Sequence, residues 1–365
     1  MTLELRNVTK RVGADVHIHP TSLTLEPGTF NILLGTTLAG KTTLMQLMAG
    51  LDRPTAGQVW FNGVDTTGMP VQKRNVAMVY QQFINYPNLT VYENIASPLR
   101  VARVRAGDID RRVREMAGLL KLTPMLDRRP GELSGGQQQR TALARALVKD
   151  ADLVLLDEPL ANLDFKLREE MREELPRLFA GREVIVVYAT TEPTEALLFG
   201  GNTATMSEGR VTQFGPTGDL YRHPEDLITA QVFSDPPINV ATVRKAGDTF
   251  TLEDASAGAA TWSASGAAAA LGDGSHTFAI RPHHITPFER GGHPVPIEGR
   301  VLVTELSGSE SVIHFTVADT TWVSVSHGIH PFEVGATARL YVDVSMAMYF
   351  DAEGKLIASQ AGGRS

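Results

Sequence analysis

The chain has 365 residues, enough for two or three globular domains, and 42% of them are hydrophobic. The formal net charge of −7 provides no basic surface, so we expect no nucleic-acid partner. The sequence contains no cysteine, which excludes disulfide bonds and thiolate metal sites, and it has no apolar run near the ~18 residues that span a bilayer.

The first half of the chain predicts strands followed by a helical region. Residues 1–80 alternate short β-rich runs with Gly and Pro turns, as in LELRNV, TSLTLEPG, TFNILLG and GQVWFNG. In DIDRRVREMAGLLKL, apolar side chains recur at helical spacing between charges. This spacing predicts an amphipathic helix that is buried through Ile109, Val113, Met116 and Leu120.

Two apolar, β-branched runs come next, LVLLDEP at 153–159 and EVIVVYAT at 183–190. Such runs are typical of buried parallel strands, and the charged segment between them, FKLREEMREEL, reads as a helix. Strands that alternate with helices indicate an α/β sheet, here with a helical insertion.

A domain boundary is predicted near the dipeptide Pro236-Pro237, in the segment SDPPIN. Beyond it, short strands are bounded by Gly turns, in FAIRP, GRVLVTELSG, SVIHFTV and ARLYVDV. This pattern favours a small β barrel or sandwich. The Ala-rich segment 256–271 is expected to form a loop or β-turn.

A strand, a tight loop and a helix follow one another in FNILLG-TTLAG-KTT, and they carry a phosphate-binding pattern, G-x-x-x-x-G-K-[ST]. In this pattern the glycines let backbone N–H groups surround phosphate oxygens at a helix N-terminus. Lys41 is expected to reach the β and γ phosphates, and the Thr42 hydroxyl to coordinate Mg²⁺. The predicted nucleotide-binding residues of this loop are Gly35, Thr36, Thr37, Leu38, Ala39, Gly40, Lys41, Thr42 and Thr43.

Two adjacent carboxylates, Asp157 and Glu158, end the apolar run LVLLDEP. At the end of a buried strand, Asp157 can hold the magnesium ion and Glu158 can polarise the attacking water. The phosphate loop alone also fits a kinase, a GTPase or a motor. Together with the two carboxylates it predicts Glu158 and Lys41 as catalytic residues of a site that hydrolyses a nucleoside triphosphate, with Mg²⁺ as cofactor; the family resemblance given below implies that the nucleotide is ATP.

A second anion-binding helix start is predicted in GELSGGQQQRTALARAL. Ser134 is a good N-cap, and Gly135 and Gly136 leave bare N–H groups at the first turn of a helix. One chain has no use for two phosphate cradles with such different roles. Two facing chains do, if each offers the residues from Ser134 to Gln137 to the nucleotide that the other holds.

The motif LSGGQQQR, lying between a phosphate loop and a strand that ends in Asp-Glu, resembles the ATP-binding cassette (ABC) proteins, and the resemblance covers the whole chain. It implies an α/β P-loop ATPase fold in residues 1–233, with a mixed sheet and a helical subdomain at about 84–150. A small, OB-like β-barrel regulatory domain would follow in 234–365. The resemblance also implies that Gln81 contacts Mg²⁺ and that Asp164 crosses the interface of a dimer.

The segment YPNLTVYENIASPL resembles the carbohydrate-importer branch of the family, in which this surface receives coupling helices of the membrane subunits. This implies an ATPase subunit in the cytoplasm, peripheral on the inner face of a bacterial plasma membrane. It would act with two permeases and, indirectly, an external solute-binding protein. VYATTEPTEALLFGG and its neighbours look closest to the ATPase subunits of glycerol and related polyol importers, which carry two different ATPases.

One departure from the family's pattern lies after the strand EVIVVYAT. The family's strand ends Thr-His-Asp, and its histidine contacts the γ-phosphate; anchoring on Glu195-Ala196 places Thr191 at the histidine position. A threonine hydroxyl donates a hydrogen bond but carries no charge. Losing one pre-organised donor typically costs ~10²- to 10³-fold in rate.

Two further departures concern nucleotide binding. Leu38 stands where a glycine is usual, next to Thr37 in place of a serine, and is strained by about 1 kcal/mol or more if the position needs a positive φ. Val12 stands where an aromatic ring stacks on adenine, a contact worth about 1–3 kcal/mol. Affinity is therefore lower unless another ring substitutes; His17 and His19 lie nearby, and we assign no metal site to them.

All three departures fall on the half-site that the chain builds for its own nucleotide, whereas the LSGGQ half that it lends is unaltered. We therefore predict an asymmetric heterodimer in which this chain's own site is slow and the partner's site does most of the turnover. The retained carboxylate Glu158 favours a slow site over a dead one. A homodimer and a non-hydrolytic regulatory subunit stay open as alternatives. A cassette protein of DNA repair or translation is disfavoured, because no sustained heptads and no second cassette occur.

Overall fold

The computed structural model describes residues 1–161, 163–252 and 260–359. The chain divides into two compact units, Met1–Gly218 and Asp219–Ser365. By this division α8 (Leu227–Val232) falls in the second unit, and the domain boundary predicted at residue 233 stays a prediction. Among the described helices, none has the length and apolar character needed to cross a membrane.

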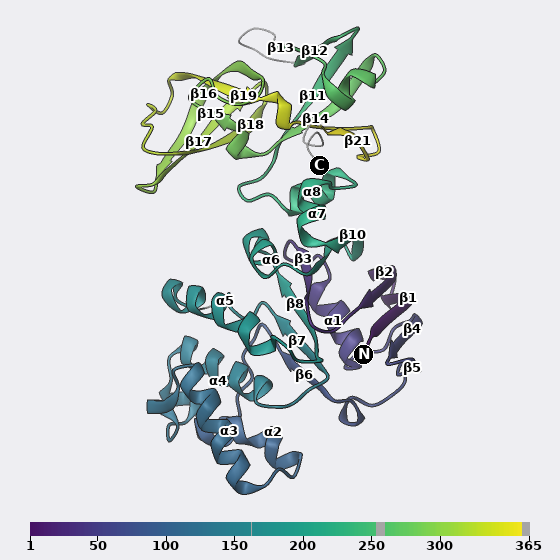
Figure 1. Ribbon diagram of the computed structural model, residues 1–365, viewed down its shortest axis with the longest axis vertical. Helices are drawn as coiled ribbons and strands as arrows, with labels where there is room; N and C mark the ends of the chain where they lie inside the picture. Colours follow the sequence, from purple (N-terminus) through teal and green to yellow (C-terminus); the bar gives the residue numbers. More distant parts are fainter. Residues whose placement is uncertain (162, 253–259, 360–365) are drawn as a thin grey trace. The chain divides into compact units, whose positions relative to one another are not determined.

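A mixed sheet forms the centre of the first unit, and its strands in the described residues follow the order β10-β9-β3-β8-β7-β6 (Figure 1). All but β10 run parallel. Every residue of β3, β7 and β8 is buried, which explains why these segments read as continuous apolar runs. The strands are β3 (Phe30–Gly35), β6 (Val76–Val79), β7 (Leu153–Asp157), β8 (Ile185–Thr190), β9 (Asn202–Ser207) and β10 (Arg210–Pro216).

α1 (Lys41–Ala49) lies between the central sheet and an antiparallel sheet in the order β2-β1-β4-β5. Buried side chains of α1 share one hydrophobic core with both sheets, so the helix that follows the phosphate loop is fixed between them. The strands of this sheet are β1 (Leu3–Val12), β2 (Asp15–Leu25), β4 (Ala56–Phe61) and β5 (Val64–Asp65).

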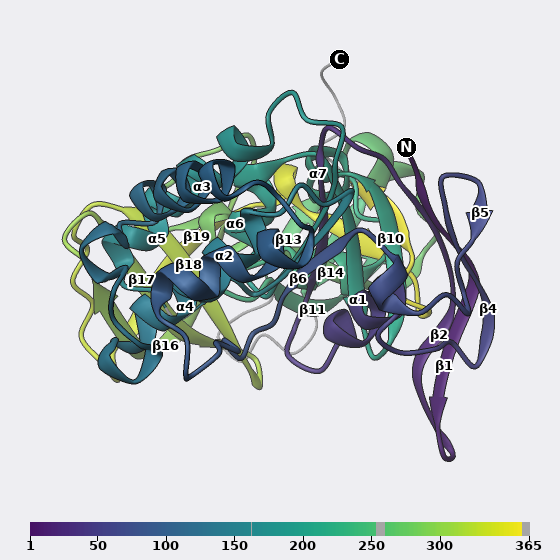
Figure 2. The same ribbon diagram turned by 90° about the horizontal axis from the view of Figure 1, so that it is seen from below.

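The predicted helical insertion contains α2 (Val91–Val101), α3 (Ala106–Leu119) and α4 (Gly135–Leu147). Figures 1 and 2 both place these helices on the opposite side of the first unit from the antiparallel sheet. The amphipathic helix is confirmed as α3: Ile109, Val113 and Leu120 are buried, and Met116 is half-buried.

Three further helices follow the central strands. α5 (Phe165–Phe179) joins β7 to β8 and turns its apolar side, with Leu167, Met171 and Leu175, into the core. α6 (Pro193–Phe199) follows β8, and α7 (Thr217–Arg222) follows β10. The charged segment after β7 is therefore helical, as predicted.

The second unit is built of strands, and the predicted small β-barrel domain is confirmed. One sheet has the order β15-β19-β16-β17-β18, and β18 also lies against β15, so this sheet nearly closes on itself. A second sheet has the order β13-β12-β11-β14-β20-β21. The strands are β11 (Asn239–Ala246), β12 (Thr249–Leu252), β13 (Thr261–Ser263), β14 (Gly274–Ile280), β15 (Ile285–Thr286), β16 (Pro294–Leu306), β17 (Glu310–Val317), β18 (Thr320–His327), β19 (Thr337–Asp343), β20 (Met348–Phe350) and β21 (Leu356–Ser359).

The Ala-rich segment 256–271 differs from the expected loop. Its first residues, up to 259, lie outside the described part of the chain, and the remainder forms β13 and a 3₁₀ helix, Gly266–Ala270. The reason is Trp262, which is buried and stacks on Phe250 of β12, so the segment is held as an edge strand.

Candidate functional site

The carboxyl ends of four neighbouring parallel strands carry the predicted site residues. In the order β3-β8-β7-β6, these strands lead into the phosphate loop, Thr191, Glu158 and Gln81 respectively. Because parallel strands end at the same edge of a sheet, four segments far apart in the sequence meet there.

The phosphate loop runs from Gly35 at the end of β3 to Lys41 at the start of α1. Glycine is required at both of its ends. A Cβ on Gly35 would lie 2.4 Å from the Met206 carbonyl oxygen, and Gly40 has φ 99° with Ile18 at 3.0 Å from a Cβ. The loop is therefore wrapped tightly between β9 and β2, with backbone N–H groups at the start of α1 available to an anion.

Leu38 adopts φ 69° and is 94% exposed. The positive φ that the sequence analysis made a condition for strain is therefore present. A leucine in this region costs roughly 1–2 kcal/mol, because its Cβ crowds the following carbonyl. The exposed side chain also recovers little of this cost by burial.

A cleft of about 490 Å³ opens beside the loop. It is lined by residues 37–43 of the loop, by Gln81 and Glu158, and by His17, which the sequence analysis noted near Val12. Val16, Glu208 and Gly209, which the sequence did not single out, also line it. The signal for the last pair was the turn sequence Glu-Gly between β9 and β10, whose positive φ angles of 47° and 73° bring Gly209 against the loop. There the Gly209 N–H donates to the Ala39 carbonyl at 3.0 Å.

Lys41 and Glu158 face each other in this cleft. The Lys41 Nζ donates to the carbonyl oxygens of Gly35 at 2.7 Å and Thr36 at 3.0 Å, and lies 3.4 Å from the Glu158 Oε1. Burial lowers the pKa of Lys41, and the attraction of Glu158 opposes that shift. A buried, charged amine held only by carbonyls and one carboxylate is ready to exchange these partners for phosphate oxygens.

Asp157, Glu158 and their polar partners form the second part of the site. The Thr42 Oγ1 donates to the Asp157 Oδ2 at 2.7 Å, and the Gln81 Nε2 donates to the Glu158 Oε2 at 3.0 Å. Burial raises the pKa of Asp157, while the Thr42 hydrogen bond acts in the opposite direction. The predicted residues Lys41, Thr42, Gln81, Asp157 and Glu158 are thus brought together.

The segment after β8 is organised around Glu195 rather than around the cleft. The buried Thr190 Oγ1 donates to the Glu195 Oε2 at 2.6 Å, and Glu192 pairs with Arg168 at 3.2 Å. Thr191 is exposed, and the described cleft lining does not include it. The catalytic role assigned to Thr191 therefore stays a prediction.

Ser134 begins α4 as predicted. Its hydroxyl accepts from the Gln137 N–H at 3.4 Å, and the Gln137 Oε1 accepts from the Ser134 N–H at 3.0 Å. A Cβ on Gly135 or Gly136 would meet nothing within 4 Å in the part of the chain that the structure describes, so packing within that part does not require these glycines. Such bare backbone suits a close approach by another molecule.

Asp164 and Val12 lie at element ends. Asp164 is the N-cap of α5 and accepts from the Leu167 N–H at 3.0 Å, while Asn162, two residues before it, lies outside the described residues. Val12 ends β1, is 53% exposed, and is absent from the described cleft lining, which includes His17.

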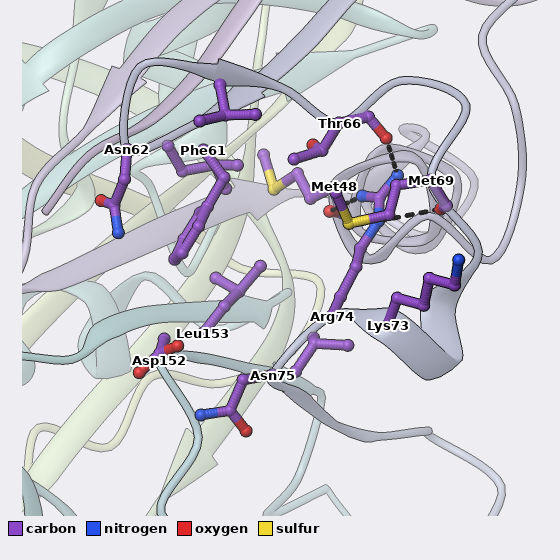
Figure 3. Close-up of a pocket in the computed structure, with 13 residues that line it drawn as sticks. Met48, Phe61, Asn62, Thr66, Met69, Lys73, Arg74, Asn75, Asp152 and Leu153 are labelled. Atoms are coloured by element: carbon purple, nitrogen blue, oxygen red, sulfur yellow. Dashed lines mark hydrogen bonds between the residues drawn. The ribbon is translucent and has the colours of Figure 1, made fainter.

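A second cavity, of about 390 Å³, lies between the antiparallel sheet and the edge of the central sheet (Figure 3). Its polar wall is Arg74, whose guanidinium donates to the carbonyl oxygens of Met69 at 3.1 Å, Met48 at 3.3 Å and Thr66. Met48 belongs to the last turn of α1, so Arg74 supports the far end of the helix that starts at Lys41.

Comparison with known proteins places these features in a family. The profile of the family described as ABC transporter matches residues 18–161. The xylose/arabinose import ATP-binding protein of Haloferax volcanii is 35% identical, over 96% of this chain and 94% of its own length. The sn-glycerol-3-phosphate import ATP-binding protein of Ruegeria pomeroyi is 34% identical over 98% and 99%, and the trehalose/maltose import ATP-binding protein of Thermococcus litoralis 34% over 96% and 97%.

A solved structure extends the similarity. A dimeric ATP-binding cassette in a post-hydrolysis state, bound to ADP and Pi, matches with a TM-score of 0.55 and 28% identity. The match covers 59% of this chain and 98% of that one. The cassette fold predicted for the first part of the chain is confirmed.

Proposed function

Because this chain belongs to the ABC transporter family of ATP-binding proteins, we propose that it binds and hydrolyses ATP to power the import of a carbohydrate or polyol across a bacterial inner membrane. The observation that carries the proposal is the joint position of Lys41, Gln81 and Glu158 beside the phosphate loop, with Thr42 bound to Asp157. Relatives that match nearly the whole chain are import subunits by name. Within this class a glycerol-like cargo is our choice, supported by the glycerol-phosphate importers among those relatives.

The chain's own residues account for hydrolysis. Lys41 leaves the Gly35 and Thr36 carbonyls and binds the β and γ phosphates, while loop N–H groups hold the phosphate oxygens. Glu158 orients the attacking water and accepts its proton as the bond from the γ-phosphorus to the bridging oxygen breaks. The products are ADP and inorganic phosphate.

The site also suits Mg²⁺. The hydroxyl of Thr42 and the carboxylate of Asp157 are adjacent oxygen donors at 2.7 Å, and the Gln81 amide oxygen is a third oxygen donor, since its nitrogen faces Glu158. These residues would hold the ion, which when bound neutralises charge on the phosphates.

We further infer an ATPase pair in which Ser134, Gly135 and Gly136 contact the nucleotide of the facing chain, and Asp164 lies at the interface. The open space beside both glycines supports this role. Three features weaken the chain's own site and no other: the strain at Leu38, the aliphatic side chain of Val12, and Thr191 in the position of the family's histidine. A heterodimer with a more active partner is therefore favoured over a homodimer. A non-hydrolytic regulatory subunit is disfavoured by the intact contact set of Glu158.

A surface for the permeases is open on the helical side of the cassette. A groove of about 600 Å³ is lined by residues of the β6 region, α2 and α4, and Tyr86 and Val101 there are 50% and 85% exposed. Exposed apolar residues around a groove mark a docking surface. Two permeases bound here would hold the chain at the inner membrane face, with an external solute-binding protein acting through them.

The experiment compares Glu158→Gln with Ser134→Arg in the assembled transporter, each measured for steady-state ATP turnover. Glu158→Gln removes the base from this chain's own site only, so we expect most turnover to persist. Ser134→Arg blocks the helix end lent to the partner, and we expect turnover to fall by about 10²-fold or more. If Glu158→Gln abolishes turnover and Ser134→Arg leaves it unchanged, the asymmetric assignment is wrong.

A further inference from the structure

Gln139 is a buried side chain that joins two parts of the nucleotide machinery. It lies in the second turn of α4, the helix that starts after Ser134, and is 2% exposed. Its Nε2 donates to the carbonyl oxygen of Pro159 at 2.7 Å. Pro159 directly follows Glu158, so the contact reaches the backbone next to the proposed base.

The backbone that Gln139 holds is an unusual one. Glu158 has φ 46°, a left-handed conformation that turns the chain out of β7. On one side the Glu158 N–H donates to the Ala189 carbonyl of β8 at 3.0 Å. After Glu158, the carbonyl of Pro159 accepts the hydrogen bond from Gln139. Such a conformation at a non-glycine residue persists only where its surroundings fix it, and these two contacts do so.

Burial is energetically unfavourable for the oxygen of the Gln139 amide. Its Oε1 is buried and, within the described residues, has no hydrogen-bond partner. Burying an amide with one half unpaired is unfavourable, and an apolar side chain of similar size would fill the same space without that cost. The hydrogen bond to Pro159 is the interaction that offsets the cost, which favours a role in placing Pro159 over simple packing.

We propose that Gln139 is a positioning residue that couples the glycine-started end of α4 to Glu158. A helix moves as a rigid element, so a shift of Ser134 toward a nucleotide on the facing chain carries Gln139 with it. Through Pro159 the same shift moves the Glu158 carboxylate relative to Lys41. The inference rests on the proposed hydrolysis by two facing chains, and it adds a direct link between the half-site that the chain lends and the one it keeps.

The test uses the full chain in its assembled transporter, with the partner ATPase carrying a glutamine in place of its own base so that only this chain's site turns over, and it measures kcat and KM for ATP at that site. Gln139→Leu keeps the volume but removes the donor, and we expect kcat to fall about 10- to 100-fold while KM changes less than about threefold. Gln139→Glu can donate to Pro159 only when its carboxyl is protonated, and burial raises the pKa of such a group. The kcat ratio of Gln139→Glu to wild type should therefore rise several-fold as the pH is lowered from about 8 to 6.

Asn31→Leu is the matched control. Asn31 is also a buried amide whose oxygen has no partner among the residues that the structure describes, and its Nδ2 donates to the carbonyls of Glu26, Thr29 and Val186, away from the cleft. We expect it to lower stability but to leave kcat within about twofold of wild type.

The inference is overturned if Gln139→Leu keeps wild-type kcat, or if Asn31→Leu lowers kcat as much. Should Gln139→Leu not fold, the pH dependence of Gln139→Glu decides, and a constant ratio to wild type rejects the coupling. A wild-type transporter that hydrolyses no ATP would instead reject the proposed function itself, and the coupling with it.

Discussion

Leu38 and Thr191 are two of the three positions at which this chain departs from the family's sequence pattern. Leu38 holds a positive φ of 69° with its side chain in solvent, a conformation that packing does not reward. Thr191 directly follows β8, the strand beside β3, where the family's pattern has a histidine. Under the proposed function, both residues affect the nucleotide site of this chain and not the Ser134 helix end.

The Thr191→His substitution tests the first of these effects. It restores a donor that can carry charge at the carboxyl end of β8, so we expect turnover at this chain's own site to rise about 10-fold or more. Thr194→His, at an exposed threonine three residues further on, is the control and should change nothing. Single-turnover hydrolysis with Ser134→Arg present isolates the site. Equal rates for both substitutions would contradict the role of position 191.

Asp157 links the site to stability through pH. Burial raises the pKa of Asp157 above its ordinary value of 3.8. The folded state is therefore stabilised by protonation of Asp157 when the pH is below 3.8, and this stabilisation is lost as the pH rises through the raised pKa of the folded state. We expect Asp157→Asn to raise the melting temperature of the nucleotide-free chain at neutral pH by about 2–4 °C, which corresponds to ~1 kcal/mol in a unit of this size.

The gain should shrink as the pH is lowered, because wild-type Asp157 then becomes neutral as well. Calorimetry from neutral pH downward measures the difference in melting temperature between Asp157→Asn and wild type. Asp15→Asn, at an exposed carboxylate, is the control and should leave the melting temperature unchanged. A melting temperature lowered by Asp157→Asn at neutral pH would mean that its hydrogen bond to Thr42 outweighs the burial of its charge.

Sequence patterns predicted the residues whose role depends on local order. Lys41 follows a glycine loop and Glu158 follows an apolar strand, and each of these features is visible within its own short segment of the sequence. Glu208 was missed as a cleft residue because it reaches the loop from the turn between β9 and β10, far away in the sequence. Gln139 was missed because a hydrogen bond to a carbonyl 20 residues away leaves no local pattern.

At the scale of elements, the strands were predictable where both faces of the sheet are covered. β7 and β8 are buried at every position, so hydrophobicity alone marks them. β13 was missed because only Trp262 of its three residues is buried, and an edge strand with one anchor resembles a loop.

The support of α1 by Arg74 gives a prediction at this scale. Arg74→Met leaves the carbonyls of Met48, Thr66 and Met69 without their donor, so we expect the free energy of unfolding of the first unit to fall by about 2–3 kcal/mol. Lys73→Met, at the exposed neighbour that lines the same cavity, should change it by less than about 0.5 kcal/mol. Urea unfolding of both variants provides the comparison. Similar losses would show that Arg74 does not brace the helix.

At the scale of the whole molecule, the chain combines an ATPase cassette with a β-barrel unit. The cassette was predicted from the phosphate loop, the LSGGQQQR motif and the family resemblance that they carry, and the β-rich unit from its short strands bounded by Gly turns. The pairing of two cassettes through the Ser134 helix start was inferred from the sequence, because one chain has no use for two phosphate-binding helix starts, and it stays a proposal. The structure places Ser134 outside the described cleft lining and leaves open space beside Gly135 and Gly136, which supports the proposal.

The most direct test of this account is the mass of the complex formed when ATP cannot be hydrolysed. The Glu158→Gln variant is mixed with the second ATPase subunit of its transporter, with and without Mg-ATP. A parallel sample uses the chain that carries both Glu158→Gln and Ser134→Arg. The account predicts a pair of ATPase subunits that forms with ATP and is lost with Ser134→Arg. A chain that binds ATP but stays unpaired, or a pair that Ser134→Arg does not disturb, would contradict it.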